Sequence, residues 1–359
     1  MKDERPFITI AQASASYPVF VGRDLIDRAG VLVPPRGRPF VITSVALRER
    51  FGNRVAHSFS PAAETITMAE GEAQKTMGTA EAVVTELLER GGKRDSMAVV
   101  VGGGMIGDTA GFAASIFLRG IDLVHVPTTL LAQVDSSIGG KLAVNHPKGK
   151  NLIGSFYPPR AVVSDTAVLD SLPARELLSG IFEAMKGGVI RDPALFELFE
   201  TKRDAVLRRE AEVIDDLVRM KIRVKAWIVA ADEKEADLRR LLNYGHTIAH
   251  GIEAAMRYEG MTHGEAVAWG MIGANAIAVR RGILSRDEAA RIERTILAYE
   301  PAAVPPLDRR DVLAATEHDK KNTGTSRVMV FPRRVGECVV AADVTTDEIA
   351  FGIDAVCRS

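Results

Sequence analysis

The chain contains the stretch Met97-Ala-Val-Val-Val-Gly102-Gly-Gly-Met-Ile-Gly107-Asp108. Its first five residues are apolar, which is typical of a buried strand in a parallel sheet. Small residues from Thr109 to Leu118 follow and predict a helix. The glycines therefore lie between a strand and a helix, where the backbone can approach a pyrophosphate and the helix amino terminus attracts its charge. The stretch indicates a dinucleotide-binding turn, the alternative being a tight turn with a purely structural role.

Strands and helices alternate around this turn. Asp122 stands at about the spacing of a ribose-binding acid, but it would also begin the next strand. A helix from Thr79 to Arg90 should end at Gly91-Gly92. The other expected strands are a pair within residues 7–21, then residues 38–43, 122–126 and 161–165. This alternation predicts a doubly wound, Rossmann-like α/β domain over residues 1–172.

The pattern changes after Pro173, where helical periodicity replaces the alternation. Two other elements are expected in this part: a hairpin that pairs residues 327–331 with 337–340, and a terminal helix from Thr346 to Cys357. The expected helices are residues 175–190, 192–230, 233–256, 264–281 and 285–298. Residues 173–359 are therefore predicted to form a mostly helical domain.

The composition excludes several classes of protein. The formal net charge is −1, so the whole molecule exerts little attraction on nucleic acid or on an anionic membrane. The two cysteines, Cys338 and Cys357, cannot form a disulfide framework, and a reducing compartment is the simple inference. The first residues lack the apolar core of a signal peptide, and no apolar run reaches the roughly 20 residues of a membrane span. We therefore expect a cytoplasmic protein.

A candidate metal centre lies in the second half, in Asn243-Tyr-Gly-His246-Thr-Ile-Ala-His250. Two histidines four residues apart stand on one helix face. Glu183 and His263 would add a carboxylate and a third imidazole, and one carboxylate with two imidazoles suits a catalytic zinc with an open position. His250 could be a fourth ligand or a proton-transfer group. Glu265 has a structural alternative that we accept, because Thr262-x-x-Glu265 is a capping box.

Two cationic clusters are candidates for anion binding. Three lysines and two asparagines occur in and after Asp135-Ser-Ser-Ile-Gly-Gly-Lys141, up to Asn151, although a solvated loop has the same composition. Lys186 follows Glu183 by three residues, so a surface ion pair is the plain interpretation, but its apolar flanks suggest a lined cavity. Lys225, Arg239 and Asn243 precede the histidines, and Arg239 and Asn243 would share a helix face with His246.

Taken together, these segments resemble the 3-dehydroquinate synthase family. The resemblance runs from about Glu72 to Lys321 and follows the family's order. Its segments are 102–108, 119–122, 127–141, 145–151, Glu183-x-x-Lys186, 242–247, 263–265 and Asp319-Lys-Lys321.

The resemblance implies an NAD-binding α/β domain followed by a helical domain that binds Zn²⁺ or Co²⁺ at Glu183, His246 and His263. The implied NAD contacts are Glu72, Lys75, Gly103, Gly104, Met105, Ile106, Gly107, Asp108, Thr128, Thr129, Lys141, Lys150, Val168, Leu169, Asp170 and Ser171. The implied substrate and catalytic residues are Asp135, Lys141, Lys150, Asn151, Lys186, Lys225, Arg239, Asn243, His250 and either Lys320 or Lys321. Because the family is usually dimeric, Arg119 would reach the site of a partner subunit.

The implied substrate is a sugar phosphate, 3-deoxy-D-arabino-heptulosonate 7-phosphate. The family converts it to 3-dehydroquinate and phosphate by transient oxidation with NAD, phosphate elimination, re-reduction and an intramolecular aldol reaction. This reaction belongs to the shikimate pathway of aromatic amino acid biosynthesis, in which the product leads to chorismate.

The chain departs from the family pattern without losing an implied ligand. Gly187, Phe182 and Ala249 replace the usual residues beside the site, and Thr43-Ser44 stand where an adenosine-side acid is usual. Three alternatives remain open at this stage: a metal-dependent polyol dehydrogenase, a sugar-phosphate cyclase with another product, and a non-catalytic NAD-binding regulator. Net NADH production would indicate the first, product analysis decides the second, and absence of phosphate release would favour the third.

Overall fold

A computed structural model describes residues 5–317 and 327–357. The chain forms two compact units. The first unit contains Met1–Leu172 and Ile214–Glu233, and the second contains Pro173–Val213 and Lys234–Ser359. The expected division into residues 1–172 and 173–359 does not include the return of Ile214–Glu233 to the first unit.

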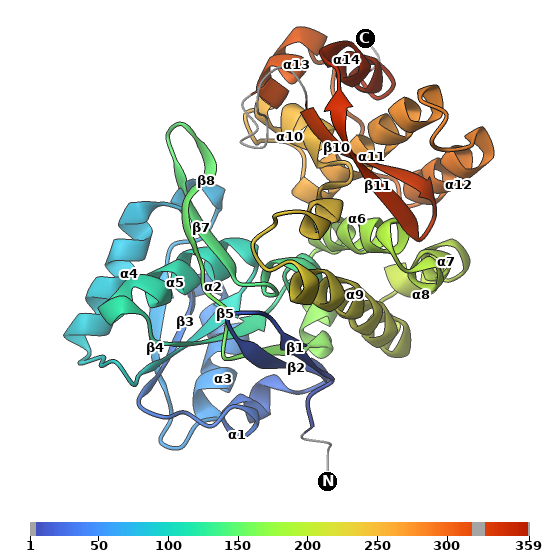
Figure 1. The fold of residues 1–359 in the computed structure, drawn as a ribbon. Coiled ribbons are helices and arrows are strands. Elements are labelled where there is room, and N and C mark those ends of the chain that lie inside the picture. Colours follow the sequence, from blue (N-terminus) through green and yellow to red (C-terminus); the bar gives the residue numbers. More distant parts are fainter. Residues whose placement is uncertain (1–4, 318–326, 358–359) are drawn as a thin grey trace. The chain divides into compact units, whose positions relative to one another are not determined.

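A seven-stranded sheet forms the centre of the first unit (Figure 1). Its strand order is β1-β2-β9-β6-β5-β3-β4, and only β1 is antiparallel to its neighbour. The strands are β1 (Ile8–Ala11), β2 (Ser16–Gly22), β3 (Pro39–Ser44), β4 (Glu64–Met68), β5 (Met97–Gly102), β6 (Asp122–Pro127) and β9 (Ala161–Asp165). The chain leaves β3 toward β4 but leaves β5 toward β6, so the strand order reverses between β3 and β5. In open parallel sheets, ligands bind at such a reversal, outside the carboxyl ends of the strands.

Two helices, α4 (Met77–Glu89) and α5 (Gly104–Ile116), pack on this sheet around a shared core. The core includes Phe40, Val100 and Leu87 and extends to Leu142 of β7 (Lys141–His146). Alanines and glycines on α5 let these layers approach closely, since a Cβ at Gly111 would lie 2.7 Å from Leu142 Cδ2. Short helices complete the unit at α1 (Ala29–Leu32), α2 (Val45–Leu47) and α3 (Asn53–His57), with most of α9 (Ala211–Ala231).

Helices dominate the second unit (Figure 1). Among them, α11 (His263–Arg280) is buried almost all round, as expected of a helix that is apolar on every face. It contacts α6 (Ala174–Ile190), α10 (His246–Ala255) and α14 (Thr346–Asp354). The other elements are α7 (Pro193–Thr201), α8 (Arg203–Leu207), α12 (Arg286–Leu297), α13 (Arg309–Glu317) and the hairpin of β10 (Arg327–Arg334) with β11 (Glu337–Val344).

Two predictions about local structure were wrong. The helix expected over 192–230 is divided into α7, α8 and α9. Arg239 and Asn243 lie on a 3₁₀ helix, η7 (Leu238–Asn243), which ends before α10, so they do not share a helix face with His246. The solvated loop, which was the alternative to an anion pocket around Lys141 and Asn151, is not what the chain forms there: these residues lie on a hairpin of β7 with β8 (Gly149–Phe156), which projects in Figure 1.

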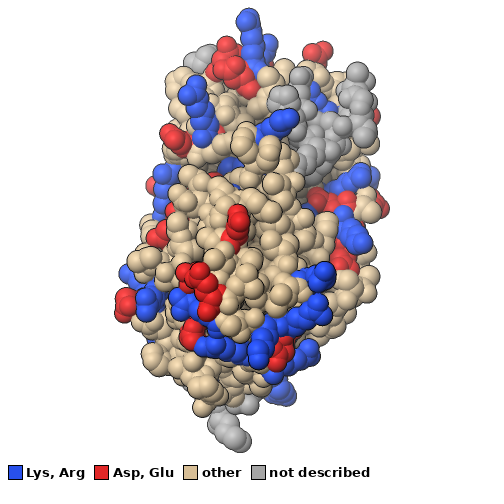
Figure 2. Space-filling model, turned by 90° about the vertical axis from the view of Figure 1, so that its left-hand side faces the viewer, with Lys and Arg blue, Asp and Glu red and all other residues tan. Residues whose placement is uncertain are grey.

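The described surface agrees with a chain of small net charge. Figure 2 shows Lys and Arg side chains interspersed with Asp and Glu side chains on the face in view, where tan residues cover most of the area. Among the described residues, no helix combines the length and the hydropathy that crossing a membrane requires.

Candidate functional site

In the first unit, the glycine turn after β5 leads into α5, whose amino terminus has no side-chain cap. Gly103 precedes α5, and no side chain caps the first turn of this helix. A Cβ at Gly102 would lie 2.7 Å from Ile106 Cβ, and a Cβ at Gly103 would lie 3.0 Å from Thr129 Cγ2. A side chain at Gly102 would clash with Ile106, and one at Gly103 would require Thr129 to shift. The uncapped N–H groups at the start of α5 suit an anion. The turn therefore has the features that a pyrophosphate requires.

Asp122 is unsuited to the role of a ribose-binding acid. It begins β6, whereas the glycine turn follows the carboxyl end of the parallel strand β5. The two positions thus lie at opposite ends of the two neighbouring strands. Asp122 is instead paired with Arg160, whose Nη1 donates to Oδ2 over 2.9 Å.

A polar network links the turn to the β7–β8 hairpin. Lys75 is almost fully buried, and its Nζ donates to Asp108 Oδ2 over 2.5 Å and to Asn151 Oδ1 over 2.6 Å. Asn145 Oδ1 accepts the backbone N–H of Asn151 over 2.9 Å, and its Nδ2 donates to Glu72 Oε1 over 2.8 Å. Burial raises the pKa of the Asp108 carboxyl, and the charge of Lys75 offsets this only in part. Asn145 is one of the two asparagines of the predicted anion-binding cluster, although the family resemblance implies no role for it.

Asp135 and Lys225 also meet in the first unit. Lys225 Nζ donates to the main-chain oxygen of Asp135 over 2.5 Å and lies 2.8 Å from its Oδ1. Lys221, one helical turn earlier on α9, is fully buried, and its Nζ lies 3.7 Å from the same Oδ1. Lys221 was not predicted from the sequence as a site residue. Its spacing of four residues from Lys225 was the available signal.

Further sequence-predicted residues of the first unit differ in burial and in contacts. Thr129 Oγ1 caps the turn that follows it, accepting the N–H of Ala132 over 3.1 Å. Val168 and Leu169 are buried, whereas the exposed Asp170 pairs with Arg23 over 2.5 Å. Arg119 is exposed and has a left-handed backbone with φ of 74°.

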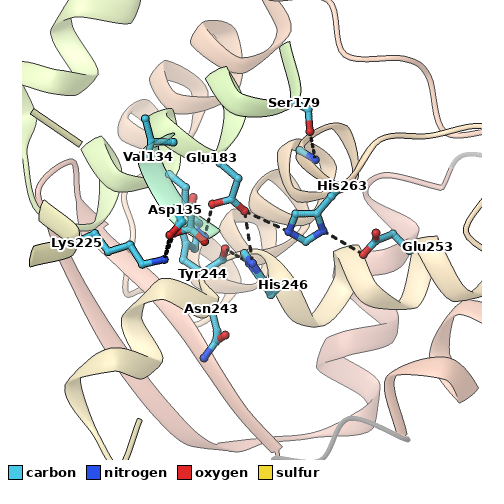
Figure 3. A network of polar contacts seen from close by, with 12 residues as sticks. Val134, Asp135, Ser179, Glu183, Lys225, Asn243, Tyr244, His246, Glu253 and His263 are labelled. Carbon is cyan, nitrogen blue, oxygen red and sulfur yellow. Dashed lines mark hydrogen bonds and ion pairs between the residues drawn. The ribbon is translucent and has the colours of Figure 1, made fainter. Parts of the chain in front are cut away.

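In the second unit, Glu183, His246 and His263 converge although 80 residues separate the first from the last. Glu183 Oε1 lies 3.5 Å from His246 Nε2 and 3.4 Å from His263 Nε2 (Figure 3). Zinc bonds of about 2.0–2.1 Å at tetrahedral angles would separate two ligand atoms by about 3.3–3.4 Å. The two distances from the carboxylate oxygen to the imidazole nitrogens are therefore those of ligands around one cation.

The electrostatics of Glu183 agree with this geometry. Its side chain is buried, and neither oxygen has a hydrogen-bond partner of acceptable geometry in the described part of the chain. Lys186 Nζ lies 2.6 Å from Oε2, so this contact is an ion pair without hydrogen-bond angles. Burial favours the protonated carboxyl, but the charges of Lys186 and the contacts with His263 and His246 outweigh it and hold the pKa of Glu183 well below its ordinary value. The carboxylate is therefore charged and available to a metal.

The start of each helix positions these ligands. Gly245 has a left-handed backbone with φ of 80°, and it turns the chain from η7 into α10 at His246. The predicted capping box is confirmed: Thr262 and Glu265 cap α11, whose first residue is His263. A Cβ at Gly264 would lie 2.0 Å from the main-chain oxygen of Ser179 on α6. This close approach of α11 to α6 brings His263 to Glu183.

Other polar groups surround the three ligands. The His250 ring centroid lies 5.4 Å from that of His246, and His250 and Glu253 form a second candidate metal group with His263. Arg239 is almost fully buried, and Asn243 Nδ2 donates to Glu235 Oε1 over 2.7 Å. Lys320 and Lys321 lie outside the described residues. Neither Glu253 nor Glu235 was predicted from the sequence as a site residue.

Family models match nearly the whole region of these motifs. Residues 65–179 match the model described as 3-dehydroquinate synthase N-terminal, and residues 180–322 match 3-dehydroquinate synthase C-terminal. The chain is 39% identical over 357 residues to the 3-dehydroquinate synthase of Koribacter versatilis, covering 97% of each chain. It is 42% identical to that of Halorhodospira halophila, covering 93% of this chain and 95% of the relative.

Solved structures show the same fold with other products. A 2-deoxy-scyllo-inosose synthase complexed with carbaglucose-6-phosphate, NAD⁺ and Co²⁺ has a TM-score of 0.87 at 28% identity, covering 96% of this chain and 98% of that one. A 2-epi-5-epi-valiolone synthase from Streptomyces hygroscopicus subsp. jinggangensis with NAD⁺ and Zn²⁺ has a TM-score of 0.88 at 27% identity, covering 97% and 98%.

A glycerol dehydrogenase from Schizosaccharomyces pombe, at 18% identity and a TM-score of 0.70, shares the fold alone; it covers 99% of this chain and 91% of its own. The identity is thus higher to synthases that make 3-dehydroquinate than to these cyclases or to the polyol dehydrogenase. The chain belongs to the 3-dehydroquinate synthase family.

Proposed function

We propose that this chain converts 3-deoxy-D-arabino-heptulosonate 7-phosphate to 3-dehydroquinate and phosphate, with NAD bound at the glycine turn and Zn²⁺ or Co²⁺ held by Glu183, His246 and His263. The observation that carries the proposal is the convergence of these three ligands in a chain of this family. Their atoms all lie within 4.8 Å of one another.

The donor set fits a catalytic divalent metal. Two imidazoles and one carboxylate leave a position for substrate, and the metal would polarise a substrate oxygen as a Lewis acid. Burial lowers the pKa of His246 well below its ordinary value, and the charge of Lys186 lowers it further. A neutral imidazole is the form that ligates a metal. Lys186, beside Glu183, is proposed to contact the anionic substrate.

The residues of the first unit fit a dinucleotide. The uncapped start of α5 would hold the pyrophosphate, with Glu72, Lys75, Gly103 to Asp108, Thr128, Thr129, Lys141, Lys150 and Val168 to Ser171 as the proposed contacts. Bound NAD would accept and later return a hydride, so the reaction has no net redox change. The Lys75–Asp108 ion pair orients both side chains at the turn.

A phosphorylated keto acid needs several cationic partners. We propose Lys141, Lys150, Arg239 and one of Lys320 or Lys321 for its phosphate and carboxylate, because guanidinium and ammonium groups bind such anions. Asp135, Lys225, Asn151 and Asn243 would hold its hydroxyl groups. His250 would move the proton of the oxidised hydroxyl, because imidazole is the side chain that titrates nearest to neutral pH.

We further propose a cytoplasmic homodimer in which Arg119 acts at the partner subunit's site. The exposed position of Arg119 and its left-handed backbone support this role, since strained backbone often accompanies functional positions. The two cysteines are free, in keeping with a reducing compartment.

The test is to incubate purified protein with the heptulosonate phosphate, NAD⁺ and Zn²⁺ while measuring inorganic phosphate, NADH and the carbocyclic product. The proposal requires stoichiometric phosphate and 3-dehydroquinate without accumulation of NADH. Net NADH would indicate a polyol dehydrogenase, and a different carbocycle would indicate another cyclase. The variant His263→Ala should lose both metal and turnover, and full activity without bound metal would refute the assignment of ligands.

A further inference from the structure

Glu253 gives His263 a second carboxylate partner. It lies on α10, is 7% exposed, and places Oε2 3.3 Å from His263 Nδ1 (Figure 3). The other nitrogen of the same ring, Nε2, lies 3.4 Å from Glu183 Oε1. The imidazole of His263 thus stands between two carboxylates, one at each nitrogen.

A neutral imidazole carries one proton and one free lone pair. If Nε2 binds the metal together with Glu183 and His246, Nδ1 must carry the proton and needs an acceptor. Glu253 Oε2 is at the position to accept it. His246 has the same arrangement, because its Nδ1 lies 3.2 Å from the main-chain oxygen of Tyr244 while its Nε2 faces Glu183.

The two acceptors differ in charge. The carbonyl of Tyr244 is neutral, whereas Glu253 is a buried carboxylate whose charge adds to that of Glu183 near the cation. A charged acceptor raises the basicity of the imidazole that it orients and so strengthens the bond from ring nitrogen to metal.

We infer that Glu253 is a positioning residue that holds His263 with Nε2 toward the metal and tightens metal binding. The inference rests on the proposed metal site and deepens it. His250, Glu253 and His263 could instead be ligands themselves, since their donor atoms also lie within 4.8 Å of one another. The first arrangement is favoured because the second would leave the buried Oε1 of Glu183, which faces both imidazole nitrogens, without a hydrogen bond or a metal ion.

The experiment compares metal affinity in the full chain by competition with a chromophoric chelator for Zn²⁺. Glu253→Ala should weaken binding about 10- to 100-fold, the usual effect of removing such a partner. Glu253→Gln should weaken it less, because the amide oxygen still accepts the Nδ1 proton without the charge. The control Glu348→Gln removes a part-buried carboxylate that pairs with Arg281 elsewhere in this unit, and it should leave the affinity unchanged.

A second readout does not depend on affinity. In ¹⁵N NMR spectra of the zinc-loaded wild-type protein, His263 should carry its proton on Nδ1, and in Glu253→Ala this proton should exchange faster with water. Wild-type affinity in Glu253→Ala would overturn the inference, as would equal losses in Glu253→Ala and Glu348→Gln. Loss of zinc in His250→Gln but not in Glu183→Gln would move the cation to the second group and also overturn it.

These outcomes are distinct from failure of the proposed function. If wild-type protein neither binds zinc nor releases phosphate, the function itself fails. If it does both while Glu253→Ala binds zinc normally, only the role of Glu253 fails.

Discussion

Replacement of Gly264 by alanine tests how closely helix packing sets the proposed metal site. The added Cβ would lie 2.0 Å from the main-chain oxygen of Ser179, whereas real Cβ atoms stay beyond 3.0 Å from such neighbours. The start of α11 must therefore move away from α6 by about 1 Å. Ligand distances in a metal site tolerate only about 0.2 Å, so His263 and Glu183 could not keep their present spacing.

The expected cost has two parts. Overpacking a tight contact costs about 1–3 kcal/mol, and the upper end is expected here because the clash is with backbone. Zinc affinity should fall at least about 10-fold, because one of three protein ligands is displaced. Thermal unfolding of the metal-free protein measures the first part, and chelator competition measures the second.

Ser179→Ala is the matched control. It removes the hydroxyl that accepts the N–H of Gly264 over 3.1 Å but leaves the close backbone approach intact. It should cost about 1 kcal/mol and leave zinc affinity unchanged. The reasoning is refuted if Gly264→Ala unfolds and binds zinc like the wild-type protein, or if Ser179→Ala loses zinc to the same extent.

Three further predictions concern the first unit. Burial lowers the pKa of His125 to about 4, so the folded state binds fewer protons than the unfolded state below the ordinary value of 6.5. Stability should therefore be lost as the pH falls from 6.5 toward 4, by about 2–3 kcal/mol at pH 4.5. Urea unfolding should show this loss in the wild-type protein and a smaller loss in His125→Leu; parallel pH profiles would contradict it. Gly102→Ala should weaken NAD binding at least about 10-fold in a fluorescence titration, because its Cβ would lie 2.7 Å from the first turn of α5. Gly78→Ala, whose Cβ meets only an ordinary contact at 3.8 Å, should bind NAD normally, and equal effects of the two would count against the reasoning. Asn145→Ala removes the oxygen that accepts the backbone N–H of Asn151, whose left-handed backbone has φ of 54°. Asn151 would then be held less firmly for substrate, so KM for the sugar phosphate should rise more than kcat falls. Steady-state kinetics would check this, and an unchanged KM would exclude the role.

Hydrophobic periodicity, together with the glycines and prolines at which it is interrupted, was enough to predict the architecture. The alternation around the glycine turn predicted the α/β unit, and the helical periodicity after Pro173 predicted the helical one, both of which are present. The histidines at 246 and 250 do share one helix, α10. These features are local, since periodicity depends on which residues repeat along a few turns and a capping box spans only four residues.

The failures occur where tertiary packing overrides local preference. The breaks between α7, α8 and α9 leave Lys202 and residues 208–210 outside the helices, although the sequence has no glycine or proline there to signal them. The left-handed turn at Gly245, after the 3₁₀ helix, likewise lies at a close contact, because a Cβ at Gly270 would lie 2.0 Å from the oxygen of Gly245. Such contacts involve residues far apart in the chain, and local propensity does not encode them.

The sequence by itself determined the two kinds of unit, the glycine turn and the residue types of the proposed metal site, because each depends on neighbouring residues or on family motifs. Only the tertiary structure decided the spacing of Glu183, His246 and His263, the contact of Glu253 with His263, and the meeting of Lys221 with Asp135. The physical reason is distance along the chain. Contacts between separate helices depend on how closely their backbones pack, and at Gly264 that packing is set by the missing side chain and the carbonyl of a helix 85 residues earlier.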